Sequence, residues 1–456
     1  MKLWIFTEEM PRKETIKKII AEFASKIKTS VPELKDLDIV PEIKDKKFTF
    51  SYIVENVECE GVEKVYIKII SGSKSFLDYL IFFQEEEPNT TDKPMFAIEE
   101  TKVDIGESRN VTAYQRNTKF VYLSYFFQDI ESLVIYFRDF PSDELDNTYS
   151  LRFGIRLLLT MGVNIWGIRN LAEYKLEPFK SVDELIEYKN KMPPPASGQR
   201  VMLTKKEDII ELSIKLDKGS GVAENRISHD PNVGQAASII YCLRKLGWEG
   251  KIILTNHHVT QENFSRARSK LVSILFKEDA TLFGLTMPSR FDLPSEYWTK
   301  EVRSEKMATI FLHVILSRLD NVEAIFDNHA GCERGYLKLN DGTFQTLPKT
   351  IFVPDLVICD HNNHKILDIE GKKDTNVELG ISEIENYDEV ENDYIKVSYP
   401  LPYTLERWVV LYGGTGTNIS HEKVAFLLNE NGQVIVSENA PEMIKESTKE
   451  YHILSK

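Results

Sequence analysis

Two acidic residues lie beside short apolar runs in the segment IFVPDLVICDHNNHKILDIEGKK, residues 351–373. Asp355 lies within the run Ile351–Ile358, and Glu370 follows the run Ile366–Ile369. Each run is short and rich in β-branched residues, which predicts a strand, and the polar DHNNHK between them predicts a turn. A hairpin built in this way would set Asp355 on the first strand beside Glu370 at the end of the second.

Lys372 stands two residues after Glu370. Because side chains alternate along a strand, Lys372 and Glu370 are expected on the same face. Two carboxylates and an ammonium at one spot suit a hard divalent cation, which prefers oxygen ligands and keeps several waters. The spacing therefore predicts a Mg²⁺ site made by Asp355 and Glu370, with Lys372 beside it.

Pro354-Asp355 followed by Glu370-Gly371-Lys372 resembles the PD-(D/E)xK signature of restriction endonucleases. The resemblance implies that the acidic pair holds the metal and that the lysine orients or deprotonates the attacking water. The bond broken would be a DNA phosphodiester. Metal-bound water has a lowered pKa, and the cation offsets charge that builds on the phosphate. Since neighbouring charges shift a lysine pKa in either direction, the protonation state of Lys372 stays open.

The alternative interpretation is that the acid-x-Lys triplet arises by chance, because the chain is rich in Asp, Glu and Lys. The apolar run before each element and the adjoining Pro-Asp favour a site. Buried strand ends rarely carry three charges unless those charges are paired or bind metal.

A second segment, SFLDYLIFF followed by KPMFAIEETK, repeats the arrangement with a longer loop. Asp78 lies in an apolar run, and Glu100-Thr101-Lys102 ends the next one. We therefore predict a second site, with Asp78 and Glu100 as metal ligands and Lys102 as the amine. No proline precedes Asp78, so an ordinary strand with a surface salt bridge between Glu100 and Lys102 is the alternative.

A helix is expected from about Glu107, and the region resembles the EcoRI-like branch of the same nuclease superfamily. In that branch the helix after the lysine carries residues that approach DNA. The residues here that the resemblance implies for DNA binding are Arg109, Asn110, Gln115, Arg116 and Lys119.

Taken together, the two segments resemble type IIS restriction enzymes that carry two dissimilar nuclease sites, EcoRI-like and FokI-like, on one chain. In that group each site cuts one strand of an asymmetric target. A two-fold dimer suits a palindrome, whereas two different sites on one chain suit an asymmetric sequence. The implied fold is a mixed α/β class with two nuclease-like cores, each a mixed central sheet flanked by helices.

The stretch KMPPPASGQR, residues 191–200, is rich in proline and small polar residues and predicts a linker. The expected organisation is an EcoRI-like nuclease and recognition domain at 1–190, a helical DNA-recognition region at 201–340 and a nuclease core at 341–456. Among the other elements, the segments 129–137, 206–216 and 420–428 are expected to be helices.

Between the predicted linker and the second site, Asn256 and His257 follow a short strand, and Arg266 and Arg268 lie on an expected helix. These four residues are candidates for DNA contact. Zinc binding at the Asn-His-His triplet is disfavoured, because partner ligands at suitable spacing are missing. A polar turn and a solvated helix face are the plain alternatives.

Composition places few limits on function. The chain has 456 residues and a net charge of −14, which argues against coating nucleic acid by bulk charge but allows a local basic groove. The four cysteines are scattered and indicate neither a disulfide framework nor zinc. The first residues, MKLWIFTEEM, do not read as a signal peptide, and no apolar run is long enough for a membrane span. We expect a cytoplasmic protein.

The leading hypothesis is a Mg²⁺-dependent, sequence-specific endonuclease that acts on double-stranded DNA as a monomer or a DNA-induced dimer. A second hypothesis keeps only the Asp355 site for chemistry, uses the first half for recognition and requires a dimer. A third is a DNA-binding protein whose nuclease folds have lost activity, and a fourth is a nuclease that recognises DNA structure.

Overall fold

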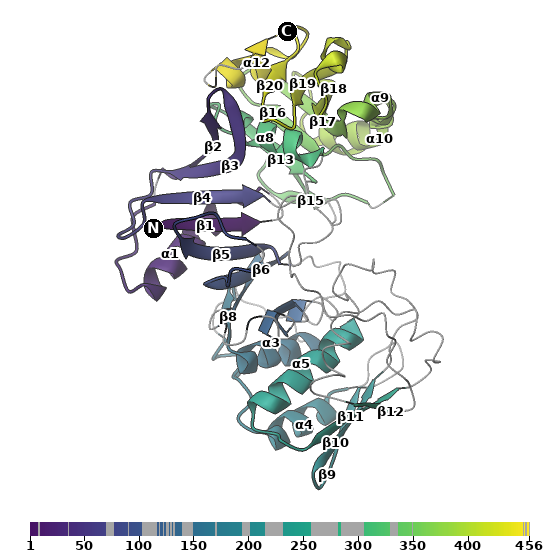
Figure 1. Cartoon of the computed structure of the whole chain (residues 1–456). Coiled ribbons are helices and arrows are strands. Elements are labelled where there is room, and N and C mark those ends of the chain that lie inside the picture. Colours follow the sequence, from purple (N-terminus) through teal and green to yellow (C-terminus); the bar gives the residue numbers. More distant parts are fainter. Residues whose placement is uncertain are drawn as a thin grey trace. The chain divides into compact units, whose positions relative to one another are not determined.

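Mixed β-sheets flanked by helices make up the computed structural model of the chain (Figure 1). The structure describes residues 1–7, 10–34, 36–69, 77–89, 91–102, 116–117, 119–121, 123–124, 127, 130, 133–138, 149–168, 171–193, 201–214, 231–256, 281–283, 305–328, 336–348, 350–449, 451 and 454–455. Within these residues the predicted α/β class is confirmed. The finer prediction of two nuclease cores stays a prediction.

Two units divide the chain, and neither is continuous in sequence. The first unit contains residues 1–72, 83–88 and 300–456, and the second contains residues 73–82 and 89–299. The continuous domains predicted above stay a prediction. In the first unit, strands from the start of the chain pack on its last third: Phe48 N donates to Gly432 O at 2.7 Å, and the Phe48 and Phe311 ring centroids lie 4.9 Å apart.

A seven-stranded mixed sheet forms the centre of the C-terminal part of the first unit. Its order is β13 (Val322–Asp327), β16 (Leu356–Asp360), β17 (Lys365–Lys373), β18 (Thr404–Tyr412), β19 (Val424–Leu428), β20 (Val434–Val436) and β21 (Leu454–Ser455). The strand β16 runs antiparallel to β13 and β17, whereas β17, β18 and β19 are parallel. Every residue of β19 is buried, as expected for a strand covered on both faces.

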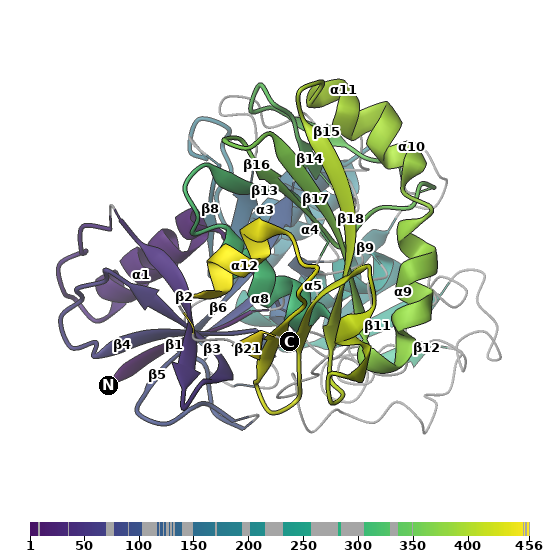
Figure 2. The ribbon, with the colours of Figure 1, turned by 90° about the horizontal axis from the view of Figure 1, so that it is seen from above.

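Helices cover both faces of this sheet. A Cβ added to Gly371 in β17 would lie 2.8 Å from Thr309 in α8 (Lys306–Leu316), and one added to Gly380 in α9 (Val377–Ile384) would lie 2.8 Å from Lys372. Because neighbouring strand residues point to opposite faces, α8 and α9 pack on opposite sides of β17. Figure 2 shows α8 and α9 on either side of β17 and β18.

Short elements complete this part of the first unit. They are β14 (Tyr336–Lys338) and β15 (Phe344–Thr346), the 3₁₀ segments Asp374–Asn376 and Thr417–Ser420, α10 (Asp388–Val390), the π-helical turn Glu391–Ile395, α11 (Lys396–Ser398) and α12 (Glu442–Lys449). The acidic stretch after β17 is therefore largely helical.

The described residues of the N-terminal part of the first unit form strands and a helix. They are β1 (Lys2–Thr7), α1 (Lys13–Lys26), β2 (Asp38–Lys44), β3 (Lys47–Glu55) and β4 (Lys64–Ile69), with the strand order β2-β3-β4-β1. The helix α1 buries Ile16, Ile19, Ile20 and Phe23, which recur at helical spacing.

The second unit contains the hairpin that carries the second predicted site. The strand β5 (Tyr79–Gln84), whose first four residues belong to this unit, pairs antiparallel with β6 (Phe96–Lys102). Next follow β7 (Leu133–Arg138) and β8 (Val163–Trp166), both parallel. The same succession of one antiparallel and two parallel pairings occurs from β16 to β19.

Among its described residues, the rest of the second unit has a sheet in the order β12-β11-β10-β9 and several helices. Its elements are α3 (Tyr149–Met161), α4 (Val182–Lys191), β9 (Met202–Lys206), β10 (Ile209–Ile214), α5 (Pro231–Lys245), β11 (Lys251–Asn256) and β12 (Thr281–Phe283). The predicted helical recognition region therefore contains strands as well as helices.

Three predicted helices are wrong. Residues 133–138 form β7, residues 202–214 form the hairpin of β9 and β10, and residues 424–428 form β19. Short apolar runs such as LVIYF and VAFLL do not distinguish a buried strand from a buried helix by periodicity. In the hairpin, the turn is made by Glu207, which adopts a left-handed φ of 48°, and by Asp208. The sequence prediction overlooked this turn.

Among the described residues, none of the helices combines the length and the apolar character needed to cross a membrane.

Candidate active site

Asp355 and Glu370 lie opposite each other where β16 and β17 meet. Leu356 pairs with Ile369, so the next residues outward, Asp355 and Glu370, face each other across the antiparallel pair. The strand β16 begins at Leu356, later than the predicted start at residue 351, and Asp355 immediately precedes it. Continued by one residue, this register sets Asp355 beside Glu370, the arrangement that the sequence predicts.

A backbone hydrogen bond fixes Asp355, whose Oδ2 accepts the N–H of Gly371 at 3.1 Å. Burial raises the pKa of Asp355, and the negative charge of Glu305 also raises it. The Gly371 N–H and the charges of Lys306 and Lys372 act in the opposite direction without cancelling the effect of burial. The N-terminal end of α8, with its N-cap Glu305 and its first residue Lys306, thus places charges of both signs near this carboxylate.

Glu370 is 5% exposed and has a partner on each oxygen. Lys372 Nζ donates to Oε1, and the hydroxyl of Tyr387 donates to Oε2. Burial and the charge of Asp355 raise the pKa of Glu370 to about 8, although both partners favour the ionised form. Each acid opposes the ionisation of the other, and a bound cation would favour the ionised form of both.

Lys372 lies between two carboxylates. Its Nζ contacts Glu370 and also lies 2.6 Å from Glu383 Oε2 on α9. Burial lowers the pKa of Lys372, but the hydrogen bonds and charges of Glu370 and Glu383 outweigh it and raise the pKa above the ordinary value. The side chain is therefore held as an ammonium ion.

The chemistry of this donor set fits Mg²⁺, which proteins often bind through one or two carboxylates while several waters complete the shell. Asp355 and Glu370 supply the two carboxylates. The part of the chain that the structure describes contains no group of three or more His, Cys, Asp or Glu side chains placed to hold a metal ion. Two carboxylates would leave the remaining positions around the cation to water.

In the second predicted site, the residue opposite Asp78 differs from the expected Glu100. Asp78 immediately precedes β5, and its Oδ2 accepts the N–H of Glu100 at 2.6 Å. Tyr79 pairs with Ile98, so the residue opposite Asp78 is Glu99. The carboxylate of Glu100 accepts a hydrogen bond from the Tyr79 hydroxyl at 2.9 Å. Lys102 ends β6, and its side chain lies outside the described residues.

The structure describes the side chains of two predicted DNA-binding residues. Arg116 and Lys119 are helical, and both donate to Glu99 Oε1, Lys119 at 2.7 Å. Asn256 ends β11, and its side chain lies outside the described residues. The remaining predicted DNA-binding residues are not described by the structure: Arg109, Asn110, Gln115, His257, Arg266 and Arg268.

Sequence reasoning missed Glu383 and Tyr387, which hold Lys372 and Glu370 respectively. They are four residues apart in the acidic stretch after β17, with Glu383 on α9 and Tyr387 just before α10. That spacing is the only sequence signal for them, and many acidic stretches contain such a pair.

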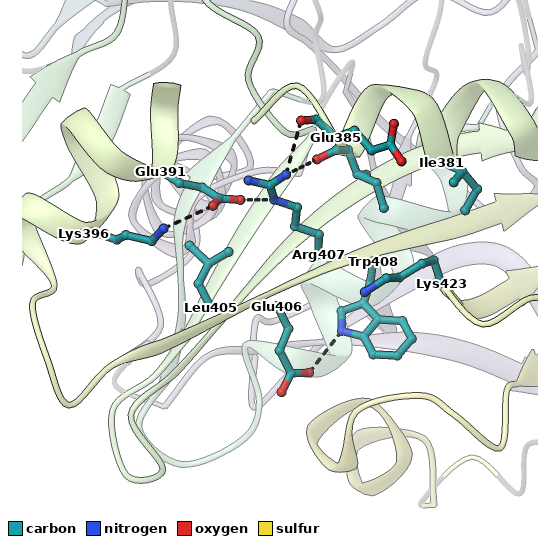
Figure 3. Close-up of a pocket in the computed structure, with 10 residues that line it drawn as sticks. Ile381, Glu385, Glu391, Lys396, Leu405, Glu406, Arg407, Trp408 and Lys423 are labelled. Carbon is teal, nitrogen blue, oxygen red and sulfur yellow. Dashed lines mark hydrogen bonds and ion pairs between the residues drawn. The ribbon is translucent and has the colours of Figure 1, made fainter. Parts of the chain in front are cut away.

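A pocket of about 540 Å³ lies on the first unit beside β18 and α9. Figure 3 shows Arg407 pointing toward Glu391, and Trp408 near Lys423. Arg407 donates to Glu391 and Asp388, while Lys423 Nζ lies 5.9 Å from the Trp408 ring centroid. The pocket lining does not include Asp355 or Glu370, so this pocket is separate from the candidate active site.

Comparison with protein-family models, with curated proteins and with solved structures found no match to this chain. The functional argument therefore depends on the geometry of the site.

Proposed function

We propose that this chain is a Mg²⁺-dependent endonuclease that hydrolyses phosphodiesters of double-stranded DNA. One observation carries the proposal: Asp355 and Glu370 face each other across two antiparallel strands, with the Lys372 ammonium bonded to Glu370. Two acids and an amine in this arrangement suit metal-assisted attack of water on a phosphate.

Mg²⁺ held by Asp355 and Glu370 would lower the pKa of a bound water and neutralise charge on the phosphate. The protein supplies the rest. The Gly371 N–H orients Asp355, and the Tyr387 hydroxyl orients Glu370. The Lys372 ammonium stabilises negative charge that develops on the phosphate oxygens. Its raised pKa favours this role over proton abstraction.

The proposal extends to a sequence-specific enzyme of the type IIS restriction class, with a cut on each strand. Two hairpins of the chain support this extension. In each hairpin an acid precedes the first strand, and one or two acids lie on the second strand. Base reading would require side chains that enter the major groove, where Arg–guanine and Asn–adenine pairs discriminate. The candidates for it are the predicted DNA-binding residues other than Arg116 and Lys119, which are bonded to Glu99.

The test is cleavage of supercoiled plasmid by the full chain with Mg²⁺ and with EDTA. We expect Mg²⁺-dependent double-strand breaks at a defined sequence, and Asp355→Asn should lose at least one of the two cuts. The matched control is Glu389→Gln, an exposed acid on α10 that should cut as well as the unchanged protein. Failure to cut any DNA in Mg²⁺, or full activity of Asp355→Asn, would contradict the proposal.

The same assay separates the remaining hypotheses. A cleavage rate that rises more than linearly with protein concentration would indicate a dimer with a single working site per chain. Cleavage at scattered positions would indicate a nuclease that recognises DNA structure.

A further inference from the structure

In the second unit, as in the first, two acids lie opposite each other on antiparallel strands. They are not the two acids that the sequence motif indicates. The register of β5 and β6 sets Asp78 opposite Glu99, as the register of β16 and β17 sets Asp355 opposite Glu370. Directly opposite residues of antiparallel strands have Cβ atoms about 5 Å apart and point to the same face. Glu99 is thus the structural counterpart of Glu370.

A hydrogen bond of the same kind supports this alignment. Asp355 Oδ2 accepts the N–H of Gly371, the residue after the second acid. Asp78 Oδ2 accepts the N–H of Glu100, the residue after Glu99. Glu100 therefore corresponds to Gly371, and its carboxylate is bonded to the Tyr79 hydroxyl.

The environment of Glu99 points to a ligand. Its side chain is completely buried, and Oε1 accepts hydrogen bonds from both Lys119 and Arg116. Oε2 is buried and has no hydrogen-bond partner within the part of the chain that the structure describes. A buried carboxylate oxygen without a partner costs free energy, and a bound cation would supply one.

The amine of this site comes from a different element. In the first unit Lys372 lies two residues after Glu370 on the same strand and contacts it. The residue two positions after Glu99 is Thr101, which carries no charge. Lys119 Nζ, from the helical segment that follows, lies 2.7 Å from Glu99 Oε1 and takes the corresponding place.

We propose that Asp78 and Glu99 form a second divalent-cation site and that Lys119 is its amine. This inference rests on the proposed nuclease function for its role, which is cutting the second DNA strand. The metal site itself depends only on the geometry of the second unit. Glu100 and Lys102, which match the sequence motif, are outside it.

The first experiment counts Mn²⁺ ions bound to the full chain by electron paramagnetic resonance, without DNA. The unchanged protein should bind two ions. Glu370→Gln and Glu99→Gln should each bind one, and the double variant none. Glu100→Gln, next in sequence and also buried, is the matched control and should bind two. Two ions on Glu99→Gln, or one on Glu100→Gln, would overturn the assignment.

The second experiment sequences the ends of cut DNA. Glu99→Gln should nick only one strand and Glu370→Gln only the other. Lys119→Met should bind two Mn²⁺ ions but cut the Glu99-dependent strand at least about 100-fold more slowly. An unchanged rate for that strand would remove Lys119 from the site. If the unchanged protein binds two ions but cuts nothing, the nuclease function fails while the metal site stands.

A variant that fails to fold can be recognised from the ion that remains bound. If Glu99→Gln still binds the ion of the first unit, that unit is folded, and circular dichroism then checks the folding of the second unit. Glu99→Asp provides a milder change that keeps the charge. We expect it to bind two ions with weaker affinity at one of them, and loss of both ions in a folded Glu99→Asp protein would contradict the inference.

Discussion

Lys372 Nζ lies 2.6 Å from Glu383 Oε2, so a residue of α9 holds the amine of the candidate site. The contact joins a strand and the helix that covers it. It also fixes the ammonium beside Glu370 and keeps its pKa raised. Glu383 therefore acts on the proposed chemistry through Lys372, as a positioning residue.

Glu383→Gln should lower the pKa of Lys372, because one of its two carboxylate partners is lost. We expect DNA cleavage to slow by about 10-fold or more, since a loosely placed catalytic group loses orientation. DNA binding should not change. NMR of ¹³C-methylated lysine measures the pKa. Glu378→Gln, an exposed acid on the same helix, is the control and should alter neither quantity.

Tyr387→Phe removes the hydroxyl that donates to buried Glu370. Loss of a hydrogen bond to a buried charged group destabilises by about 1–3 kcal/mol, and the carboxylate loses its fixed orientation. We expect a lower midpoint of urea unfolding together with a reduced kcat. Tyr394→Phe, a partly buried tyrosine nearby in sequence, serves for comparison. A Tyr387→Phe enzyme with unchanged kcat would show that Glu370 needs no such support.

Gly371→Ala tests the close approach of α8 to β17. The new Cβ would lie 2.8 Å from Thr309 Cγ2 and 3.1 Å from Asp355 Oδ2. Overpacking of this kind typically costs about 1–3 kcal/mol, and here it also pushes the carboxylate of the site. Unfolding in urea and DNA cleavage measure both effects.

Thr309→Ser is the matched second change, because it removes the methyl group that the new Cβ would meet. The double variant should recover part of the stability lost by Gly371→Ala, as expected for two residues in contact. Strictly additive losses would indicate that the backbone moves instead.

Asp38→Asn tests an ion pair in the first unit. Asp38 Oδ2 accepts from Arg318 Nε at 2.9 Å, and Oδ1 accepts from Lys13 Nζ at 3.1 Å. Burial raises the pKa of Asp38, but the hydrogen bonds from Arg318 and Lys13 outweigh it and lower the pKa below the ordinary value of 3.8. Because the folded pKa lies below the unfolded one, the stabilisation is complete above pH 3.8 and is lost as the pH falls through the folded pKa.

We therefore expect the unchanged protein to be more stable than Asp38→Asn by about 1 kcal/mol at neutral pH, and the difference to disappear in acid. Urea unfolding at several pH values measures it. Asp36→Asn, which changes an exposed neighbour, is the control variant. A constant difference across the pH range would mean that the charge of Asp38 does not matter.

The sequence alone determined the local parts of the candidate site. The apolar runs around Asp355 and Glu370 predicted a hairpin, and the two-residue spacing placed Lys372 on the face of Glu370. These features follow from the alternation of side chains within a strand, which needs no tertiary information. The mixed α/β class followed from the same periodicities.

Only the tertiary structure decided which acid faces Asp78. The loop 85–95 between β5 and β6 is long, so it does not fix the register, and a shift of one residue exchanges Glu100 for Glu99. The contacts of Glu383, Tyr387 and Lys119 were also undecided, since each brings a helix against a strand. A sequence records the order of such residues, whereas packing of the helix on the sheet sets which of their side chains meet.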